Sequence, residues 1–140
     1  MKKLLSLLLC LSLFVLPLFS CGGAVRIERE EWVLVSASLY EEVLCVSEEY
    51  HASAPNAEVL DVTLVASGGT LTLTDKTNGK TYTGTYGDRA EPSPSSADHK
   101  ATLGAASGRI LISEVPLAEG GTVPSLTLTL DDYMLSFIAK

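Results

Sequence analysis

The residues of this chain that could do chemistry are few, and they do not form a complete catalytic set. Glu48 and His51 are three positions apart, the spacing of a carboxylate and a histidine in di-iron sites. Such a site needs two of these pairs on a four-helix bundle, and this chain has one pair and no bundle pattern. His99 lies in a segment expected to be a loop, where a general base could not be held rigidly. We therefore expect both histidines to be solvated surface residues.

The cysteines and acidic pairs do not predict a reactive site either. Cys45 stands between Leu44 and Val46, and the charged residues near it are acidic. A reactive thiolate needs a nearby positive charge, so we expect Cys45 to be a small buried hydrophobic residue. Adjacent carboxylates in a strand point to opposite faces and do not converge on calcium. Since phosphate-loop, zinc and serine-hydrolase motifs are absent from the sequence, we expect no enzyme, metal site or cofactor.

The N-terminal segment predicts export. Lys2 and Lys3 precede an apolar run over residues 4–19. As a helix this run would be about 24 Å long, which is shorter than the roughly 30 Å hydrocarbon core of a membrane. The pattern is that of a signal peptide over residues 1–20 rather than of a permanent membrane anchor.

The end of this segment, Leu18-Phe19-Ser20-Cys21, resembles the lipobox of bacterial lipoproteins. In that family the cysteine is diacylated and becomes the N-terminus of the mature chain. The resemblance implies a lipidated Cys21, a tether over residues 21–30, and a protein held on the bacterial cell membrane or outer membrane, facing away from the cytoplasm. The alternative is an ordinary secretory signal, in which case Cys21 could form a disulfide with Cys45.

The charge of the mature chain limits its partners. Without residues 1–20 the sequence has 8 Lys and Arg against 17 Asp and Glu, a net charge of −9. Nucleic-acid binding depends on clustered basic residues, so we exclude nucleic acid as a partner. Electrostatic adhesion to anionic lipid is disfavoured for the same reason. The membrane contact that we expect is the lipid on Cys21.

Residues 31–140 predict a single domain of short antiparallel strands. Strands are expected over residues 32–40, 58–66 and 109–115, where β-branched and apolar residues gather. Residues 41–54 fit either an amphipathic helix or a short strand with an irregular turn, and the β-branched residues favour the strand. Two further segments, residues 87–100 and 118–124, are expected to be loops, the first of them exposed and flexible.

A first hairpin is predicted at Asn78-Gly79, the strongest short hairpin signal, because a type I′ turn needs positive φ at both central residues. A two-residue loop would pair Thr77 with Lys80. The same register pairs Asp75 with Tyr82, Leu73 with Gly84, and Leu71 with Tyr86. It places these residues on one face of the hairpin and the threonines on the other.

A second hairpin is predicted near the C-terminus, with its turn at Asp131-Asp132. A two-residue loop there would pair Leu130 with Tyr133, Leu128 with Leu135, and Leu126 with Phe137. The leucines would again share one face, with threonines on the other.

One-sided strands must bury their apolar face, so the fold class is all-β: a small antiparallel up-and-down barrel or sandwich of six to eight short strands. With the Trp32-Val33-Leu34-Val35-Ser36 strand and the two hairpins, the chain resembles the lipocalin-like domains of bacterial lipoproteins. That resemblance implies a membrane-anchored lipoprotein that binds a small apolar ligand.

Two functions remain open at this point. A ligand-binding barrel predicts an interior void, whereas a structural or protein-interaction lipoprotein of the envelope predicts a filled interior and an exposed apolar patch. The residues that would line a ligand site also suit plain core packing. They are Trp32, Leu71, Leu73, Tyr82, Tyr86, Leu128, Tyr133 and Phe137.

Overall fold

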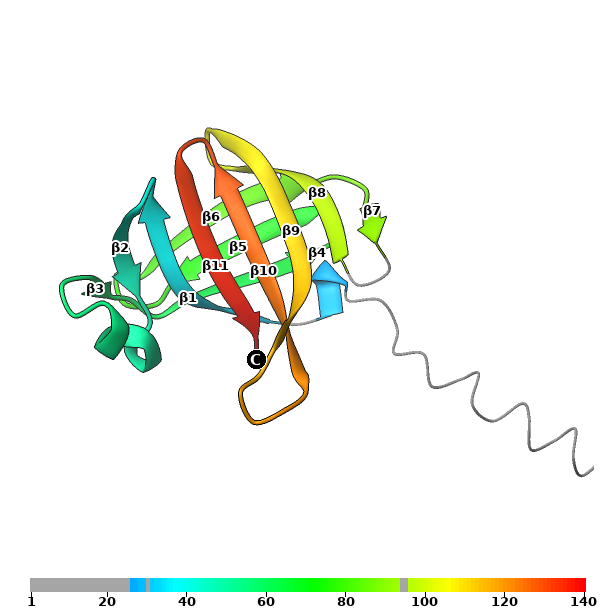
Figure 1. The fold of residues 1–140 in the computed structure, drawn as a ribbon. Helices are drawn as coiled ribbons and strands as arrows, with labels where there is room; N and C mark the ends of the chain where they lie inside the picture. The colour runs from blue at the N-terminus through cyan, green and yellow to red at the C-terminus, as the bar shows by residue number, and fades with distance from the viewer. Residues whose placement is uncertain (1–25, 30, 94–95) are drawn as a thin grey trace, which may run out of the picture.

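The computed structural model describes residues 26–29, 31–93 and 96–140, and these form a closed antiparallel β-barrel (Figure 1). The barrel strands are β1 (Trp32–Leu39), β4 (Val62–Ser67), β5 (Thr70–Asp75), β6 (Lys80–Tyr86), β8 (Ser96–Leu103), β9 (Ala106–Pro116), β10 (Thr122–Leu130) and β11 (Tyr133–Ala139). Outside it lie β2 (Glu42–Val46), β3 (Glu58–Val59), β7 (Ala90–Ser93) and the short 3-10 helices η2 (Ile27–Arg29) and η3 (Glu48–Ser53). The predicted all-β fold is confirmed.

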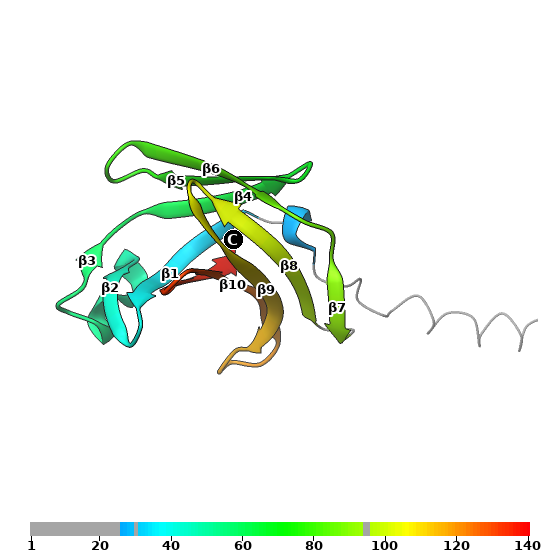
Figure 2. The same cartoon turned by 90° about the horizontal axis from the view of Figure 1, so that it is seen from above.

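The topology is an up-and-down meander that closes on itself. Strands β4, β5, β6, β8, β9, β10 and β11 each pair with the next, and β11 pairs along the whole of β1. Strand β1 reaches β4 through Trp32 and Val33 only, and its second half pairs with β2 instead. Figure 2 shows β4, β5 and β6 on one side of the barrel and β9, β10 and β11 on the other. The structure is therefore a barrel rather than a sandwich, and it is consistent with a small lipocalin-like barrel.

The two ends of the barrel differ. At the η2 end, β1 begins and β11 finishes, and the Lys140 backbone N–H donates to the carbonyl of Glu31 (3.0 Å). The β4–β5 turn lies at the same end. The opposite end carries the β1–β2, β5–β6, β8–β9 and β10–β11 turns. Residue 26, where the described chain starts, therefore belongs to the η2 end.

Alternating side chains fill the barrel. Fully buried large side chains come from β1, β4, β5, β9, β10 and β11: Trp32, Leu34, Leu64, Leu71, Ile110, Ile112, Leu126, Leu128 and Phe137 are each at most 2% exposed. Each such burial contributes roughly 1.5–3 kcal/mol. The η2 end is closed by Ile27, which is 1% exposed and whose carbonyl accepts a hydrogen bond from the Trp32 indole (2.9 Å). The interior that these residues enclose is a packed core.

Two glycines allow neighbouring strands to come close enough for this small barrel to close. A Cβ at Gly84 would overlap the carbonyl oxygen of Thr102, and a Cβ at Gly108 would overlap that of Thr129. Glycine inside a strand often marks a sharp bend where another backbone approaches. These positions tolerate no side chain without movement of the adjacent strand.

The first predicted hairpin forms, but its register is wrong by two residues. Asp75 pairs with Lys80 and Leu73 with Tyr82, so the loop has four residues, 76–79. An even shift keeps every residue on its predicted face. The turn is not of type I′, which requires a positive φ at both central residues: of the loop residues only Gly79 has a positive φ, of 65°.

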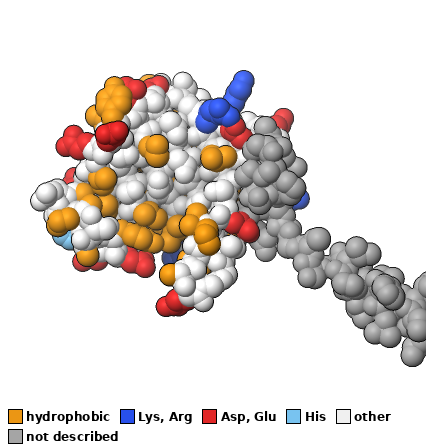
Figure 3. Space-filling view, in the orientation of Figure 1, with side chains coloured by type: hydrophobic (Ala, Val, Ile, Leu, Met, Phe, Trp, Pro, Cys, Tyr) orange, Lys and Arg blue, Asp and Glu red, His pale blue; other side chains and the backbone are white. Residues whose placement is uncertain are grey.

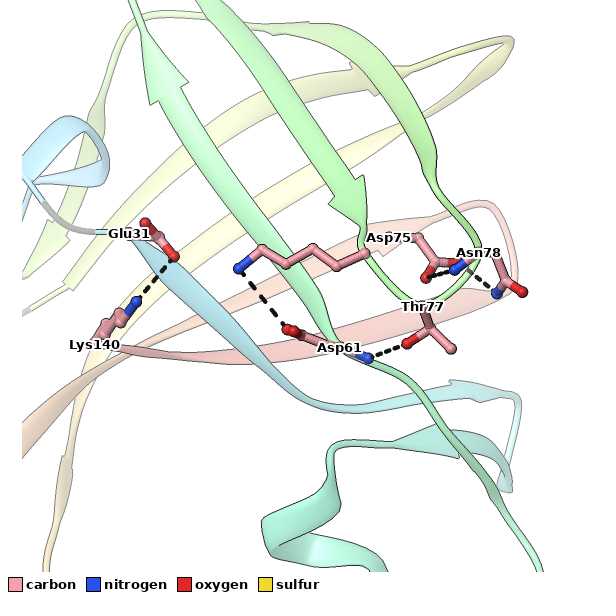
Figure 4. Close-up of polar contacts among 7 residues, drawn as sticks. Glu31, Asp61, Asp75, Thr77, Asn78 and Lys140 are labelled. Carbon is pink, nitrogen blue, oxygen red and sulfur yellow. Dashed lines mark hydrogen bonds and ion pairs between the residues drawn. The ribbon is translucent and has the colours of Figure 1, made fainter.

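Side-chain hydrogen bonds hold the wider loop in place (Figure 4). The Asp75 carboxylate accepts from the Asn78 backbone N–H (3.0 Å) and from its side-chain amide (2.7 Å). The hydroxyl of Thr77 accepts from the Asp61 backbone N–H (2.8 Å), and Lys76 forms an ion pair with the Asp61 carboxylate (4.0 Å). The loop is thus fastened to the chain that leads into β4.

The second predicted hairpin is confirmed in its register. Leu130 pairs with Tyr133, Leu128 with Leu135, and Leu126 with Phe137. Asp131 takes a φ of 50° in the two-residue turn.

The prediction of a loop over residues 87–100 is wrong, because this segment contains β7 and the first part of β8. Ala97, His99 and Ala101 alternate inward and are at most 5% exposed. Small residues and a histidine fill the inward positions here, so the segment lacks the large apolar residues by which a half-buried strand is normally recognised. Residues 41–54 form β2 followed by η3, in agreement with the favoured strand interpretation.

The predicted signal peptide and lipobox lie outside the described residues. Within residues 26–29, 31–93 and 96–140, no helix is long and apolar enough to cross a membrane.

Candidate functional site

The residues expected to line a ligand site do not meet in one pocket. Trp32, Leu71, Leu128 and Phe137 are at most 1% exposed and Leu73 is 6% exposed, all within the packed core. The other three are tyrosines at the ends of the barrel. Tyr82 and Tyr133 lie toward the opposite end, 45% and 47% exposed, whereas Tyr86 lies at the η2 end.

A small polar pocket opens at the η2 end, and we call it the mouth pocket. It has a volume of about 400 Å³. Three segments surround it: the chain around η2, the β4–β5 turn and the end of β6, with one residue from β8. The lining residues are Arg26, Ile27, Glu28, Gly68, Gly69, Tyr86, Gly87, Asp88, Arg89 and His99.

His99 is the buried member of this pocket, and the prediction that it is a surface residue is wrong. It is 5% exposed, and its Nδ1 lies 2.9 Å from the carbonyl oxygen of Gly87. Since a carbonyl only accepts, Nδ1 carries the hydrogen, and in the neutral ring Nε2 is an acceptor. Nε2 is buried and has no hydrogen-bond partner in the described part of the chain.

Tyr86 connects His99 to η2. Its ring meets the imidazole of His99 edge to face, with centroids 5.7 Å apart and an angle of 85° between the planes. Its hydroxyl donates to Oε1 of Glu28 (2.8 Å). Burial raises the pKa of Tyr86, and the nearby Glu28 carboxylate raises this pKa further. The hydroxyl therefore remains a hydrogen-bond donor at neutral pH.

The charges around the mouth pocket are balanced. Arg26 and Arg89 are positive, and Glu28 and Asp88 are negative. The β4–β5 turn contributes Gly68-Gly69 to the pocket, and both residues have positive φ, 57° and 83°. Only glycine adopts two such conformations in succession at little cost, so this wall presents backbone rather than side chains.

Cys45 does not provide a reactive thiol. It is a free, half-buried cysteine in β2. Burial raises its pKa, a backbone hydrogen bond with Ala37 opposes this, and the carboxylates of Glu58 and Asp75 raise the pKa further. The thiol is accordingly protonated at neutral pH and a poor nucleophile.

His51 and Glu48 lie together on η3, outside the barrel. Among the residues that the structure describes, no group of three or more His, Cys, Asp or Glu side chains could hold a metal ion.

Exposed apolar side chains gather at the opposite end, and we call this group the rim cluster. It consists of Tyr40, Val43, Leu44, Tyr133 and Met134, which are between 40% and 71% exposed. Ser38 pairs with both Val43 and Met134, which places these two side chains on one face of the sheet, whereas Tyr133 pairs with Leu39 and lies on the other face. Figure 3 shows a small hydrophobic group with acidic side chains beside it at the upper left, and a broader hydrophobic area lower on the same face.

A larger groove follows β6, β8 and β9, with a volume of about 860 Å³. Arg109 binds both carboxylate oxygens of Asp98 across it. Because the Arg109 side chain is 72% exposed, this ion pair contributes little to stability.

Comparison with protein-family models, with curated proteins and with solved structures gave no match, so the choice among these surfaces depends on the geometry of this chain.

Proposed function

We propose that this chain is a lipid-anchored lipoprotein of the bacterial envelope, and that its barrel is a protein-interaction module rather than a container for an apolar ligand. The filled interior supports this choice. Side chains that would have to line an internal ligand site, such as Leu71 and Leu128, are instead fully buried against one another. A small apolar ligand, the alternative function, would have to displace packed side chains at a cost typical of core disruption.

The rim cluster is the observation that carries the proposal. Exposed apolar residues grouped at one end of a small domain commonly mark a protein contact, and Tyr and Met are enriched in such contacts. The position of the cluster also fits an anchored protein. Arg26 is five residues after Cys21, a distance of at most about 18 Å, so a lipid on Cys21 keeps the η2 end near the membrane. The rim cluster then faces away from the membrane, toward a partner.

Membrane fractionation of cells that express the Cys21→Ser variant tests the anchor. Two acyl chains give stable attachment, so we expect the wild-type protein in the membrane fraction and the variant released from it. Retention of the variant in the membrane fraction would refute lipid anchoring through Cys21.

Site-specific photocrosslinking in the native host tests the interaction. A photoreactive amino acid at Met134 should give a protein adduct of one defined mass, whereas the same amino acid at Thr83, exposed on β6 outside the rim cluster, should give none. Equal adducts at both positions, or none at Met134, would count against the rim cluster as a docking surface. Native mass spectrometry of the purified protein adds an independent check, since a co-purified apolar small molecule would favour the ligand-binding alternative.

A further inference from the structure

We propose that Asn78 is a site of spontaneous deamidation, that its contact with Asp75 slows this reaction, and that the reaction loosens the β5–β6 loop from the chain that leads into β4. The site lies in the loop of residues 76–79 and shares no residue with the mouth pocket or the rim cluster. It is independent of the proposed protein partner.

The order Asn78-Gly79 exposes the asparagine to attack by its own main chain. The Gly79 nitrogen attacks Cγ of Asn78, the bond from Cγ to Nδ2 breaks, and Nδ2 leaves as ammonia together with the proton of the Gly79 N–H. A five-membered succinimide ring remains. Water then opens this ring at either of its carbonyls and leaves aspartate or isoaspartate. A side chain on the following residue would hinder the attack, and glycine has none.

The structure leaves room for this reaction at Asn78. Both Asn78 and Gly79 are exposed, and, apart from the chain neighbours of Gly79, nothing lies within 4 Å of the place that its Cβ would take. The other asparagine of the sequence, Asn56, is followed by Ala57, and the sequence has no glutamine. Asparagine is among the thermolabile residues of proteins. We therefore expect deamidation at Asn78 ahead of any other residue.

Asp75 holds the atom that must leave. Nδ2 of Asn78 donates to Oδ2 of Asp75 (2.7 Å), and the Asn78 backbone N–H donates to Oδ1 (3.0 Å) (Figure 4). A carboxylate only accepts, so the amide nitrogen rather than the amide oxygen faces Asp75. Nδ2 can leave only after its bond to Asp75 has broken. A hydrogen bond to a charged group is strong enough to slow such a step about tenfold or more.

Deamidation reverses the sign of this contact. The carboxylate that replaces the amide has no hydrogen to donate and lies opposite the Asp75 carboxylate, so an attraction becomes a repulsion between like charges. Isoaspartate also lengthens the main chain of the loop by one carbon atom. The same loop is fastened through Thr77, whose hydroxyl accepts from the Asp61 backbone N–H (2.8 Å). A change at the neighbouring residue 78 therefore loosens this fastening.

Peptide mapping of the full-length protein, incubated at mildly alkaline pH, is the direct test. Mass spectrometry locates each deamidated residue, and enzymatic methylation detects isoaspartate. A synthetic peptide of residues 73–84 lacks the fold and supplies the unrestrained rate. We expect Asn78 to convert about tenfold or more slowly in the protein than in the peptide, and Asn56 to remain intact while it does. Conversion of Asn78 at the peptide rate would overturn the role of Asp75, and equal conversion of Asn56 would overturn the assignment of the site.

Matched variants test Asp75 itself. Asp75→Ala frees the Asn78 amide, whereas Asp61→Ala removes the same charge and leaves the Asp75 contact in place. Alanine is used because it introduces no new asparagine. We expect Asp75→Ala to convert at Asn78 about tenfold or more faster than the wild type, and Asp61→Ala to convert at the wild-type rate.

Trp32 fluorescence verifies that each variant is folded before the rates are compared, and the comparison with the peptide stands even where a variant does not fold. Equal rates in the wild type and a folded Asp75→Ala would contradict the protective contact. An intact Asn78 in folded Asp75→Ala, over the time in which the peptide converts, would refute the site.

The loosening of the loop is measured on Asn78→Asp, which carries the aspartyl product from the start. The Asp61 N–H, which Thr77 holds, should exchange its hydrogen about tenfold faster than in the wild type. The Leu60 N–H, which donates to the Val46 carbonyl (2.9 Å), is the internal control and should exchange as before. Wild-type exchange at Asp61 in Asn78→Asp would show that the loop stays fastened and would overturn this part of the proposal.

Discussion

The hydroxyl of Tyr86 donates to Oε1 of Glu28 across 2.8 Å, and this contact joins the end of β6 to η2, which lies 58 positions earlier in the chain. Together with the bond from the Trp32 indole to the Ile27 carbonyl, it fixes η2 over the end of the barrel. The side chains of Tyr86 and Trp32 therefore hold the three-residue helix η2 in place, and η2 closes one end of the barrel.

Replacement of Tyr86 by Phe should lower the free energy of unfolding by about 0.5–1.5 kcal/mol, the usual net contribution of one hydrogen bond. Urea denaturation followed by Trp32 fluorescence measures the change, and it also reports on η2 because Trp32 bonds to Ile27. Tyr82→Phe, at an exposed position toward the opposite end, is the control and should change stability by less than about 0.5 kcal/mol. Equal effects of the two substitutions would contradict the assigned role of the Glu28 contact.

Leu71→Ala should destabilise the protein by about 2–5 kcal/mol, because it removes a fully buried side chain and leaves a cavity in a packed core. The matched control is Leu117→Ala, since Leu117 is 50% exposed and its truncation should cost no more than about 0.5 kcal/mol. Chemical denaturation of both variants supplies the comparison. If Leu71→Ala behaved like its control, the interior could not be packed as described, and the ligand-binding alternative would regain support.

Asp75 should make stability depend on pH below the neutral range. Hydrogen bonds from Asn78 hold the pKa of Asp75 below its ordinary value. A carboxyl group whose pKa is lower in the folded state stabilises the protein fully above its unfolded pKa of about 3.9, and this contribution disappears as the pH falls through the folded pKa. Asp75→Asn should therefore lower stability at pH 7 and lose less stability than the wild type on acidification below about pH 4.

Denaturation of both proteins at a series of pH values measures this effect, and Asp132→Asn, at an exposed position in the C-terminal turn, is the control. A stability difference between wild type and Asp75→Asn that is the same at pH 7 and well below pH 4 would show that the carboxylate charge has no role in the β5–β6 loop.

Gly108→Ala should cost about 3 kcal/mol or more, because the new methyl group would overlap the Thr129 carbonyl and force β9 away from β10. Gly87→Ala is the matched control: its methyl group would meet only Lys100 atoms at 3.9 Å, an ordinary contact distance. Thermal unfolding of the two variants tests the difference. A Gly108→Ala protein with the wild-type melting temperature would mean that the strands do not approach as closely as described.

Face patterning and the register of the second hairpin were predictable from the sequence, whereas the register of the first hairpin and the inward position of His99 were not. The alternation of Leu and Thr set the faces of both hairpins, and it is unaffected by a shift of two residues. The four-residue loop of the first hairpin depends on Asp61, which lies outside the hairpin, so local turn chemistry alone favoured the shorter loop. At Asp131-Asp132 a weaker turn signal led to the correct register.

The mouth pocket was missed for a related reason. His99 stands between Asp98 and Lys100, a context that indicates solvent, and its burial depends on small residues two positions away on either side. The alternation of Ala97, His99 and Ala101 was the available signal. This alternation identifies a strand only when the whole barrel is known, because small inward residues are accommodated where large side chains from other strands fill the core.

The pairing of β1 with β11 affects how the domain folds. Trp32 pairs with Ala139, so the barrel closes between its first and last strands. A chain whose contacts join residues far apart in the sequence folds more slowly than one built from local contacts. Until Tyr133–Ala139 has been synthesised, β1 lacks the partner that runs along its whole length, and β10 has an open edge. The barrel can therefore close only once Tyr133–Ala139 is present to pair with β1.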